Sequence, residues 1–166
     1  MFKEKAVESM KKYFAGNERY INHTLKVLAH AETIYNAEVI NDSFINNVVT
    51  LSTIFHDIGI PEAERKYSSP AAEYQEKEGP PIARRLMAGI DVRPDILERV
   101  CYIVGHHHTI EKVDGMDFQI IWEADFLVNI EEKNITLEKS SYQKAIEENF
   151  KTETGRKLII PLLKDL

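Results

Sequence analysis

The chain has 166 residues, of which 43% are hydrophobic and 29% are charged, and its formal net charge is −6. These values are ordinary for a globular protein that buries a hydrophobic core. The acidic balance, without any block of lysine and arginine, argues against a nucleic-acid polymer as partner. It leaves a small phosphorylated substrate open.

Three features bear on where the protein works. The single cysteine, Cys101, rules out an internal disulfide and suits a reducing compartment. The first residues, MFKEKAVESMKKYF, are charged throughout and lack the apolar stretch of a signal peptide. No apolar run approaches the length of a membrane span. We therefore expect a cytoplasmic protein with no membrane partner.

Apolar residues recur at helical spacing along nearly the whole chain, and no pair of segments has the chemistry of a β-hairpin. The pattern predicts an all-α, single-domain helical bundle of about six to seven helices. Capping residues and Gly or Pro positions give the expected boundaries. The predicted helices are 2–15, 17–37 with Asn17 as N-cap, 42–59 with Asp42 or Ser43 as N-cap, 71–87 with an interruption at Gly79-Pro80-Pro81, 94–104, 118–130 and 142–150, and 62–69 is predicted to be a loop.

The stretch IFHDIGIPE places His56 and Asp57 side by side at the end of the most apolar predicted helix. An ionised aspartate is costly to bury there without a partner, and a divalent ion would be such a partner. Adjacent helical residues point about 100° apart, so both reach one ion only if it lies over the helix end. Taken alone, a His-Asp pair more often marks a hydrogen-bonded histidine and a solvated aspartate.

The pair is accompanied by two polar residues that stand in mid-helix among apolar neighbours, His23 and Asp125. Four ligands from three helices could converge in the core of a bundle. The order His, His-Asp, Asp resembles the HD-domain phosphohydrolase superfamily, with Lys26 three positions after the first histidine and Ala124 directly before the last aspartate. The resemblance covers roughly residues 19–129.

This resemblance implies one HD-like domain over 1–166, with its core at about 19–129 and a C-terminal helical extension at about 136–166. It implies that His23, His56, Asp57 and Asp125 hold a divalent ion, which could be Fe, Mn, Ni, Co, Mg or Zn.

Relatives with two metals add a histidine after the HD pair and another at a later His or His-His. Here the later position is His106-His107-His108, of which successive residues cannot all face one point. The spacing to Asp125 favours His107 as ligand, and His106 and His108 are then candidates to contact substrate, unless one of them faces solvent. Glu78 stands where the other histidine is found, so either a carboxylate ligand or a solvent-facing residue is consistent with the sequence. One metal or two therefore remain open.

Candidate catalytic residues are Asp57, Lys26 and Glu62, and Arg84 is a candidate for binding phosphate, because guanidinium suits phosphate oxygens. Lys26 shares the helix face of His23. The glutamate found in some nucleotidase members three positions after the HD aspartate is absent, and Glu62 or Glu64 could replace it.

The resemblance implies a metal-dependent phosphohydrolase that uses metal-activated water to cleave a phosphate ester or anhydride of a small molecule, most plausibly a nucleotide. The alternatives are a di-iron oxygenase on the same ligand set and a non-catalytic metal- or ligand-binding module. Trp122 and Phe126 are expected to belong to the core. The apolar segment 151–166 could dock on the body of the protein or on a second subunit, which makes a homodimer a further expectation.

Overall fold

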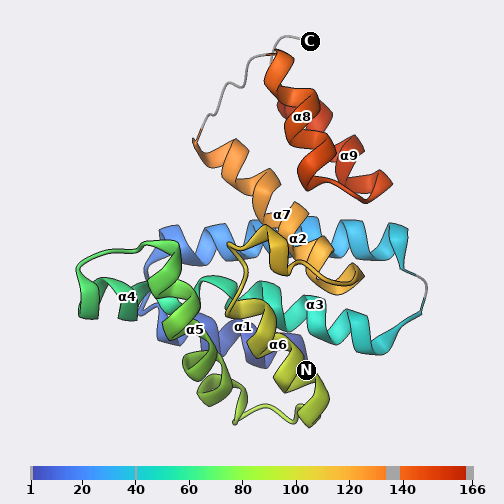
Figure 1. The fold of residues 1–166 in the computed structure, drawn as a ribbon. Helices are drawn as coiled ribbons and strands as arrows, with labels where there is room; N and C mark the ends of the chain where they lie inside the picture. The colour runs from blue at the N-terminus through green and yellow to red at the C-terminus, as the bar shows by residue number, and fades with distance from the viewer. Residues whose placement is uncertain (1, 40, 134–138, 164–166) are drawn as a thin grey trace.

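The computed structural model describes residues 2–39, 41–133 and 139–163, and no strand occurs among them (Figure 1). The predicted all-α bundle in a single domain is confirmed. The elements are α1 (Phe2–Tyr13), α2 (Glu18–Glu38), α3 (Ser43–Phe55), the 3-10 helix η1 (His56–Gly59), α4 (Ile60–Tyr67), α5 (Ala72–Met87), α6 (Pro94–Val104), η2 (Ile110–Lys112), α7 (Met116–Lys133), α8 (Lys139–Asn149), α9 (Glu153–Ile159) and η3 (Ile160–Leu162).

The core lies around α3, which runs beside α2 across the middle of the molecule (Figure 1). Helix α7 packs against both α2 and α3, while α6 and α1 cover other sides of α3 and α5 packs on α6 and η1. Every residue of α3 from Val48 to Phe55 is buried, which explains why this stretch carries only apolar side chains and the small hydroxyl side chains of Thr50, Ser52 and Thr53. Burying one large apolar side chain stabilises the fold by about 1.5–3 kcal/mol, so this helix is the main organiser of the core.

Two of the predicted N-cap residues, Asn17 and Asp42, cap the first turns of α2 and α3. The carboxylate of Asp42 accepts a hydrogen bond from the backbone N–H of Ile45 at 3.0 Å, and Asn17 accepts one from the N–H of Tyr20 at 3.5 Å. Each bond satisfies a backbone donor that the first helical turn leaves free.

The predicted loop over 62–69 is wrong, because most of it belongs to helix α4. This short helix begins with Pro61 in its first turn, where a missing N–H costs nothing. Arg65 and Lys66 pair with Glu62 at helical spacing, and Ala63 is buried. The polar sequence thus codes an amphipathic turn of helix rather than an irregular segment.

The expected break at Gly79-Pro80-Pro81 is also wrong, since α5 continues through both prolines. The prolines remove two backbone donors and would ordinarily end a helix. Close packing against η1 and α6 outweighs that cost. A Cβ atom added at Gly59 would lie 2.9 Å from the backbone nitrogen of Gly79. The two glycines therefore let the backbone of η1, which we call the HD turn because it contains His56 and Asp57, touch the backbone of α5.

The C-terminal elements dock on the body of the chain as far as residue 163, with α9 against α2 and α7. The side chain of Glu123, fully buried on α7, accepts hydrogen bonds from the backbone N–H groups of Lys151 and Thr152 at 2.6 and 3.0 Å. The hydroxyl of Thr152 also donates to Glu123 and caps α9 by accepting from Gly155. In the described residues, no helix has the length and apolarity needed to cross a membrane.

Candidate metal centre

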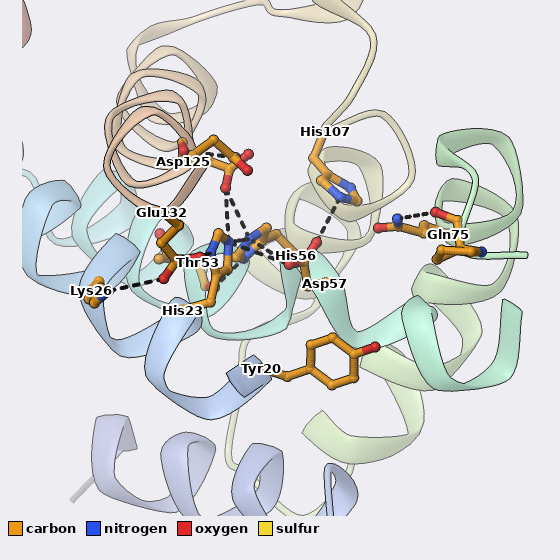
Figure 2. A network of polar contacts seen from close by, with 12 residues as sticks. Tyr20, His23, Lys26, Thr53, His56, Asp57, Gln75, His107, Asp125 and Glu132 are labelled. Atoms are coloured by element: carbon orange, nitrogen blue, oxygen red, sulfur yellow. Dashed lines mark hydrogen bonds and ion pairs between the residues drawn. The ribbon is translucent and has the colours of Figure 1, made fainter. Parts of the chain in front are cut away.

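Three elements bring four of the predicted ligands together in the core (Figure 2). His23 comes from α2, His56 and Asp57 from η1, and Asp125 from α7. The Nε2 atom of His23 lies 3.4 Å from Nε2 of His56, 3.5 Å from Oδ2 of Asp57 and 3.1 Å from Oδ1 of Asp125. The Nε2 atom of His56 lies 3.4 Å from Oδ2 of Asp57 and 3.6 Å from Oδ1 of Asp125. We call these four residues the metal cluster, because their donor atoms could hold a metal ion.

The neighbours His56 and Asp57 face one point because α3 ends just before them. Phe55 leaves the helical region with φ −111° and ψ 3°, and the next four residues form the tighter turn of η1. His56 is fully buried and the side chain of Asp57 is 15% exposed. The side chains of His56 and Asp57 therefore meet over the end of α3, which is the arrangement that two adjacent residues need in order to reach one ion.

Backbone and carboxylate acceptors orient both imidazoles of the cluster. The Nδ1–H of His56 donates to the carbonyl oxygen of Thr53 at 2.7 Å, and Nδ1 of His23 lies 3.0 Å from Oε2 of Glu132. Since a carbonyl or carboxylate only accepts, the hydrogen lies on Nδ1 and Nε2 is the atom that faces the cluster. A carboxylate behind a histidine is a common support for a metal ligand.

The carboxylates change the affinity of these histidines for protons. Burial of His56 lowers its pKa, but the charges of Asp57 and Asp125 outweigh burial and raise it to about 9. Burial likewise opposes protonation of His23, whose pKa is nevertheless raised through the hydrogen bond to Asp125. The carboxylates thus favour the protonated form of both imidazoles.

The two aspartates respond in the opposite direction. Burial raises the pKa of Asp57, but the charge of His56 and the nearby ring of His107 bring it far below its ordinary value. The same holds for Asp125, whose pKa is lowered by its hydrogen bonds to His23 and His56 against the effect of burial. Both carboxylates are ionised near neutral pH and present anionic oxygens to the cluster.

His107 lies on the other side of Asp57. Its Nδ1–H donates to the carbonyl of Val104 at 2.8 Å, so Nε2 is the atom that points to Oδ1 of Asp57 at 3.4 Å. This nitrogen is buried and has no hydrogen-bond partner in the described part of the chain. A buried nitrogen without a partner is costly, and a cation beside it would use its lone pair.

Two groups of donor atoms in the described residues could hold a metal ion. One is His23, His56 and Asp57, joined by Asp125 at the distances above, and the other is Asp57, His107 and His108. Imidazole nitrogens and carboxylate oxygens suit divalent transition metals, so the donors fit such an ion. Asp57 belongs to both groups, with Oδ2 toward one and Oδ1 toward the other.

The other two histidines of the trio lie differently. His108 is exposed and its Nε2 lies 3.1 Å from Oε1 of Gln75. The Nδ1 atom of His106 lies 2.7 Å from the carbonyl of Tyr102, and its ring packs on that tyrosine with centroids 4.6 Å apart. The structure thus brings His107 and His108 to the centre but turns His106 elsewhere.

Three predicted site residues have other partners. Glu78 accepts hydrogen bonds from Lys66 at 2.7 Å and from Tyr67 at 2.9 Å. Glu62 is bound through both oxygens to Arg65. The guanidinium of Arg84 is paired with both oxygens of Glu98, the nearer at 2.6 Å. The structure does not bring these three residues into the metal cluster.

A cavity of about 740 Å³ opens over the cluster. Lys26 lies in its wall with the ammonium 3.1 Å from Oε1 of Glu132. Arg19 also lines it, is exposed, and forms no hydrogen bond or ion pair with a described residue. The remaining lining residues are cluster members, polar neighbours and the apolar Ile60 and Pro70: Tyr20, Asn22, His23, Asp57, Ile60, Glu64, Pro70, Gln75, His108, Asp125, Asn129 and Glu132.

Sequence reasoning missed Glu132 and Arg19. Glu132 lies seven residues after Asp125, a spacing that places both on one face of a helix, but the predicted helix ended at 130 and α7 continues to 133. Arg19 lies four residues before His23 on α2, and this spacing was the available signal.

Comparisons of this chain with family models, with curated proteins and with solved structures found no match.

Proposed function

We propose that this protein is a metal-dependent phosphohydrolase that cleaves a phosphate ester of a small molecule, most plausibly a nucleotide. The observation that carries the proposal is the meeting of four donor atoms, from His23, His56, Asp57 and Asp125, beside a cavity that all but the buried His56 line. The resemblance of the motifs to the HD-domain superfamily supports the same reaction class.

His23, His56, Asp57 and Asp125 would hold the ion, and His107 and His108 offer a second position that shares Asp57. A divalent ion held there would act as a Lewis acid and bring the pKa of bound water toward neutrality. The oxygens of Thr53 and Glu132 orient the imidazoles of His56 and His23 so that the Nε2 atom of each faces the metal cluster.

The cations on the cavity wall are suited to the phosphate end of a substrate. Arg19 is free to form the paired hydrogen bonds that guanidinium makes with phosphate oxygens. Lys26, the catalytic candidate from the sequence, adds positive charge on the same wall, although Glu132 shares it. These side chains would hold the phosphoryl group beside the cluster and balance its charge.

In the reaction the oxygen of water bonds to phosphorus and the ester P–O bond breaks; the attacking water gives up a proton, and the departing alkoxide takes one. Among the glutamates considered for this role, Glu64 lines the cavity and accepts a hydrogen bond from Tyr20 at 3.2 Å. Glu62 is held away by Arg65. We therefore assign proton transfer to Glu64 rather than to Glu62.

The test is a turnover screen on protein stripped with chelator and reloaded with Mn²⁺, Fe²⁺, Co²⁺, Ni²⁺, Mg²⁺ or Zn²⁺. Phosphate release from nucleotides and simple phosphomonoesters is followed together with oxygen consumption. We expect phosphate release with at least one ion, and its loss in Asp57→Asn. The variant Arg84→Gln is the matched control and should retain it.

Two outcomes would replace the proposal. Oxygen consumption by the iron-loaded protein without phosphate release would favour the oxygenase alternative. Metal binding without any product would favour a binding module.

A further inference from the structure

A second, smaller cavity of about 310 Å³ adjoins the one over the metal cluster and differs from it in chemistry. Its walls include the side chains of Trp122, Phe126 and Ile130. The larger cavity carries Arg19 and Lys26 instead. Both cavities are lined by His108, Asp125 and Asn129, so the two spaces meet at a member of the metal cluster.

The aromatic wall is one face of α7. Trp122 lies three residues before Asp125 on this helix, whereas Phe126 and Asn129 lie one and four residues after it. This arrangement puts the indole, the phenyl ring and the metal-cluster carboxylate along one stripe. Trp122 and Phe126 are half-buried rather than enclosed in the core as the sequence suggested.

Residues at and just after the end of α8 hold these rings in place. The indole Nε1–H of Trp122 donates to Oδ1 of Asn149 at 3.1 Å, and Phe126 meets Phe150 edge to face with ring centroids 5.4 Å apart. Asn149 is itself fixed, because its amide donates to the carbonyl of Ala145 at 2.9 Å. A flat apolar surface that is already ordered loses little entropy when a ligand covers it.

We propose that this second cavity is the subsite for the heteroaromatic base of a nucleoside monophosphate whose phosphate lies over the metal cluster. The identification of the phosphate end rests on the proposed function. The base end rests on the wall of Trp122 and Phe126, because aromatic side chains stack on the faces of bases. His108 and Asn129, at the junction, supply polar groups where the sugar joins the two ends.

The chain contains one tryptophan, so its fluorescence reports on this subsite alone. Metal-free protein, in which turnover is stopped, is titrated with adenosine, AMP, ribose 5-phosphate and inorganic phosphate, and the AMP titration is repeated with Mn²⁺. We expect adenosine and AMP to change the emission of Trp122, whereas ribose 5-phosphate and phosphate leave it unchanged. Equal changes with AMP and ribose 5-phosphate, or no change with adenosine and AMP, would overturn the proposal.

Substitutions test the same surface without relying on the fluorophore. Phe126→Ala and Asn149→Ala should each weaken AMP binding, the former by about tenfold, a loss in the range of base stacking on an aromatic ring. Binding of ribose 5-phosphate should stay within about twofold. Tyr74→Ala, which alters a half-buried aromatic stack outside both cavities, is the matched control and should bind AMP normally. Equal losses for AMP and ribose 5-phosphate in Phe126→Ala and Asn149→Ala would contradict a base subsite.

Phosphate release and tryptophan emission distinguish a failure of the proposed hydrolase activity from a failure of the proposed base subsite. Emission changes with adenosine and AMP, without phosphate release from any compound, would support the subsite and reject the hydrolase. Equal kcat/KM for AMP and ribose 5-phosphate, with no emission change, would support the hydrolase and reject the subsite. An alkyl phosphate that alters the emission when AMP does not would show that the cavity takes an apolar chain, and this too would reject the base.

Discussion

Three imidazoles near the centre, those of His23, His56 and His107, are each held from behind by an acceptor that leaves Nε2 free to face inward. For His56 and His107 the acceptor is a backbone carbonyl from the end of the preceding helix. For His23 it is the carboxylate of Glu132, which brings a negative charge. Among these three supports, only that of His23 can be removed by substitution of a side chain.

The first prediction concerns this support. Glu132→Gln keeps an oxygen that can accept from His23 but loses the charge, so we expect the affinity for Mn²⁺ or Co²⁺ to fall about tenfold. The measurement is calorimetric titration of the metal-free protein. Glu131→Gln is the control, since Glu131 pairs with His30 at 3.2 Å outside the metal cluster. Equal affinities in the two variants would show that the charge behind His23 has no effect.

The second prediction concerns protons at His56. Its pKa of about 9 means that the metal-free protein holds a proton there at pH 7, whereas Asp57 and Asp125 are already ionised. Metal binding should therefore release about one proton from His56 at pH 7, and this release should disappear above pH 9. Titrations in two buffers of different ionisation enthalpy give the proton count. A count that is the same at pH 7 and pH 10 would contradict the assignment.

At the scale of elements, the contact between η1 and α5 decides where the HD turn lies. Backbone atoms of α5 lie directly against Gly59, and the nitrogen of Gly79 would be only 2.9 Å from a Cβ atom added there. The four-residue turn is thus held between the end of α3 and the face of a helix that tolerates two prolines.

The third prediction follows from this contact. Gly59→Ala forces η1 and α5 apart, so we expect the free energy of unfolding to fall by about 1–3 kcal/mol, the usual cost of overpacking. Metal affinity should fall as well, because His56 and Asp57 move with the turn. Gly89→Ala is the control, since an added Cβ there meets no atom within 4 Å. Chemical denaturation measures both variants, and equal stabilities would refute the argument.

The all-helical fold and the four members of the metal cluster could be predicted because each has a local signature. Apolar periodicity shows the helices, and His23 and Asp125 stand out as polar residues in apolar helices. The uninterrupted α5 could not be predicted, since tertiary packing there outweighs local preference. Helix α4 did have local signals, namely Pro61 in its first turn and the charge pairs of Glu62 at helical spacing. The partners of Glu78 and Arg84 depend on which helices meet, and no local pattern contains that information.

On the scale of the whole molecule, the metal cluster joins helices that are distant in sequence. His23, His56 and Asp125 come from α2, η1 and α7, which meet only in the folded chain. A bound ion would therefore add its binding free energy to the stability of the entire bundle.

The fourth prediction tests this link. At an ion concentration about 100 times the Kd, binding contributes about 2.7 kcal/mol, so chelation should lower the Tm by roughly 5–10 °C for a chain of this size. His56→Ala should show no difference between metal-loaded and chelated samples. His30→Ala, on the same helix as His23 but paired with Glu131, should keep the full difference. Scanning calorimetry gives these values, and a Tm that does not respond to chelation in the unaltered protein would contradict the prediction.

The buried carboxylate of Glu123 has a consequence for C-terminally truncated versions of the protein. Residues 151 and 152 supply three of its four hydrogen bonds and Gln119 supplies the fourth, yet it lies two positions from Asp125 on the same helix. A shortened chain that stops after α7 would remove those three hydrogen bonds and uncover a carboxylate that the intact chain buries. Deletion of the tail is therefore a poor way to isolate the part that carries the metal cluster.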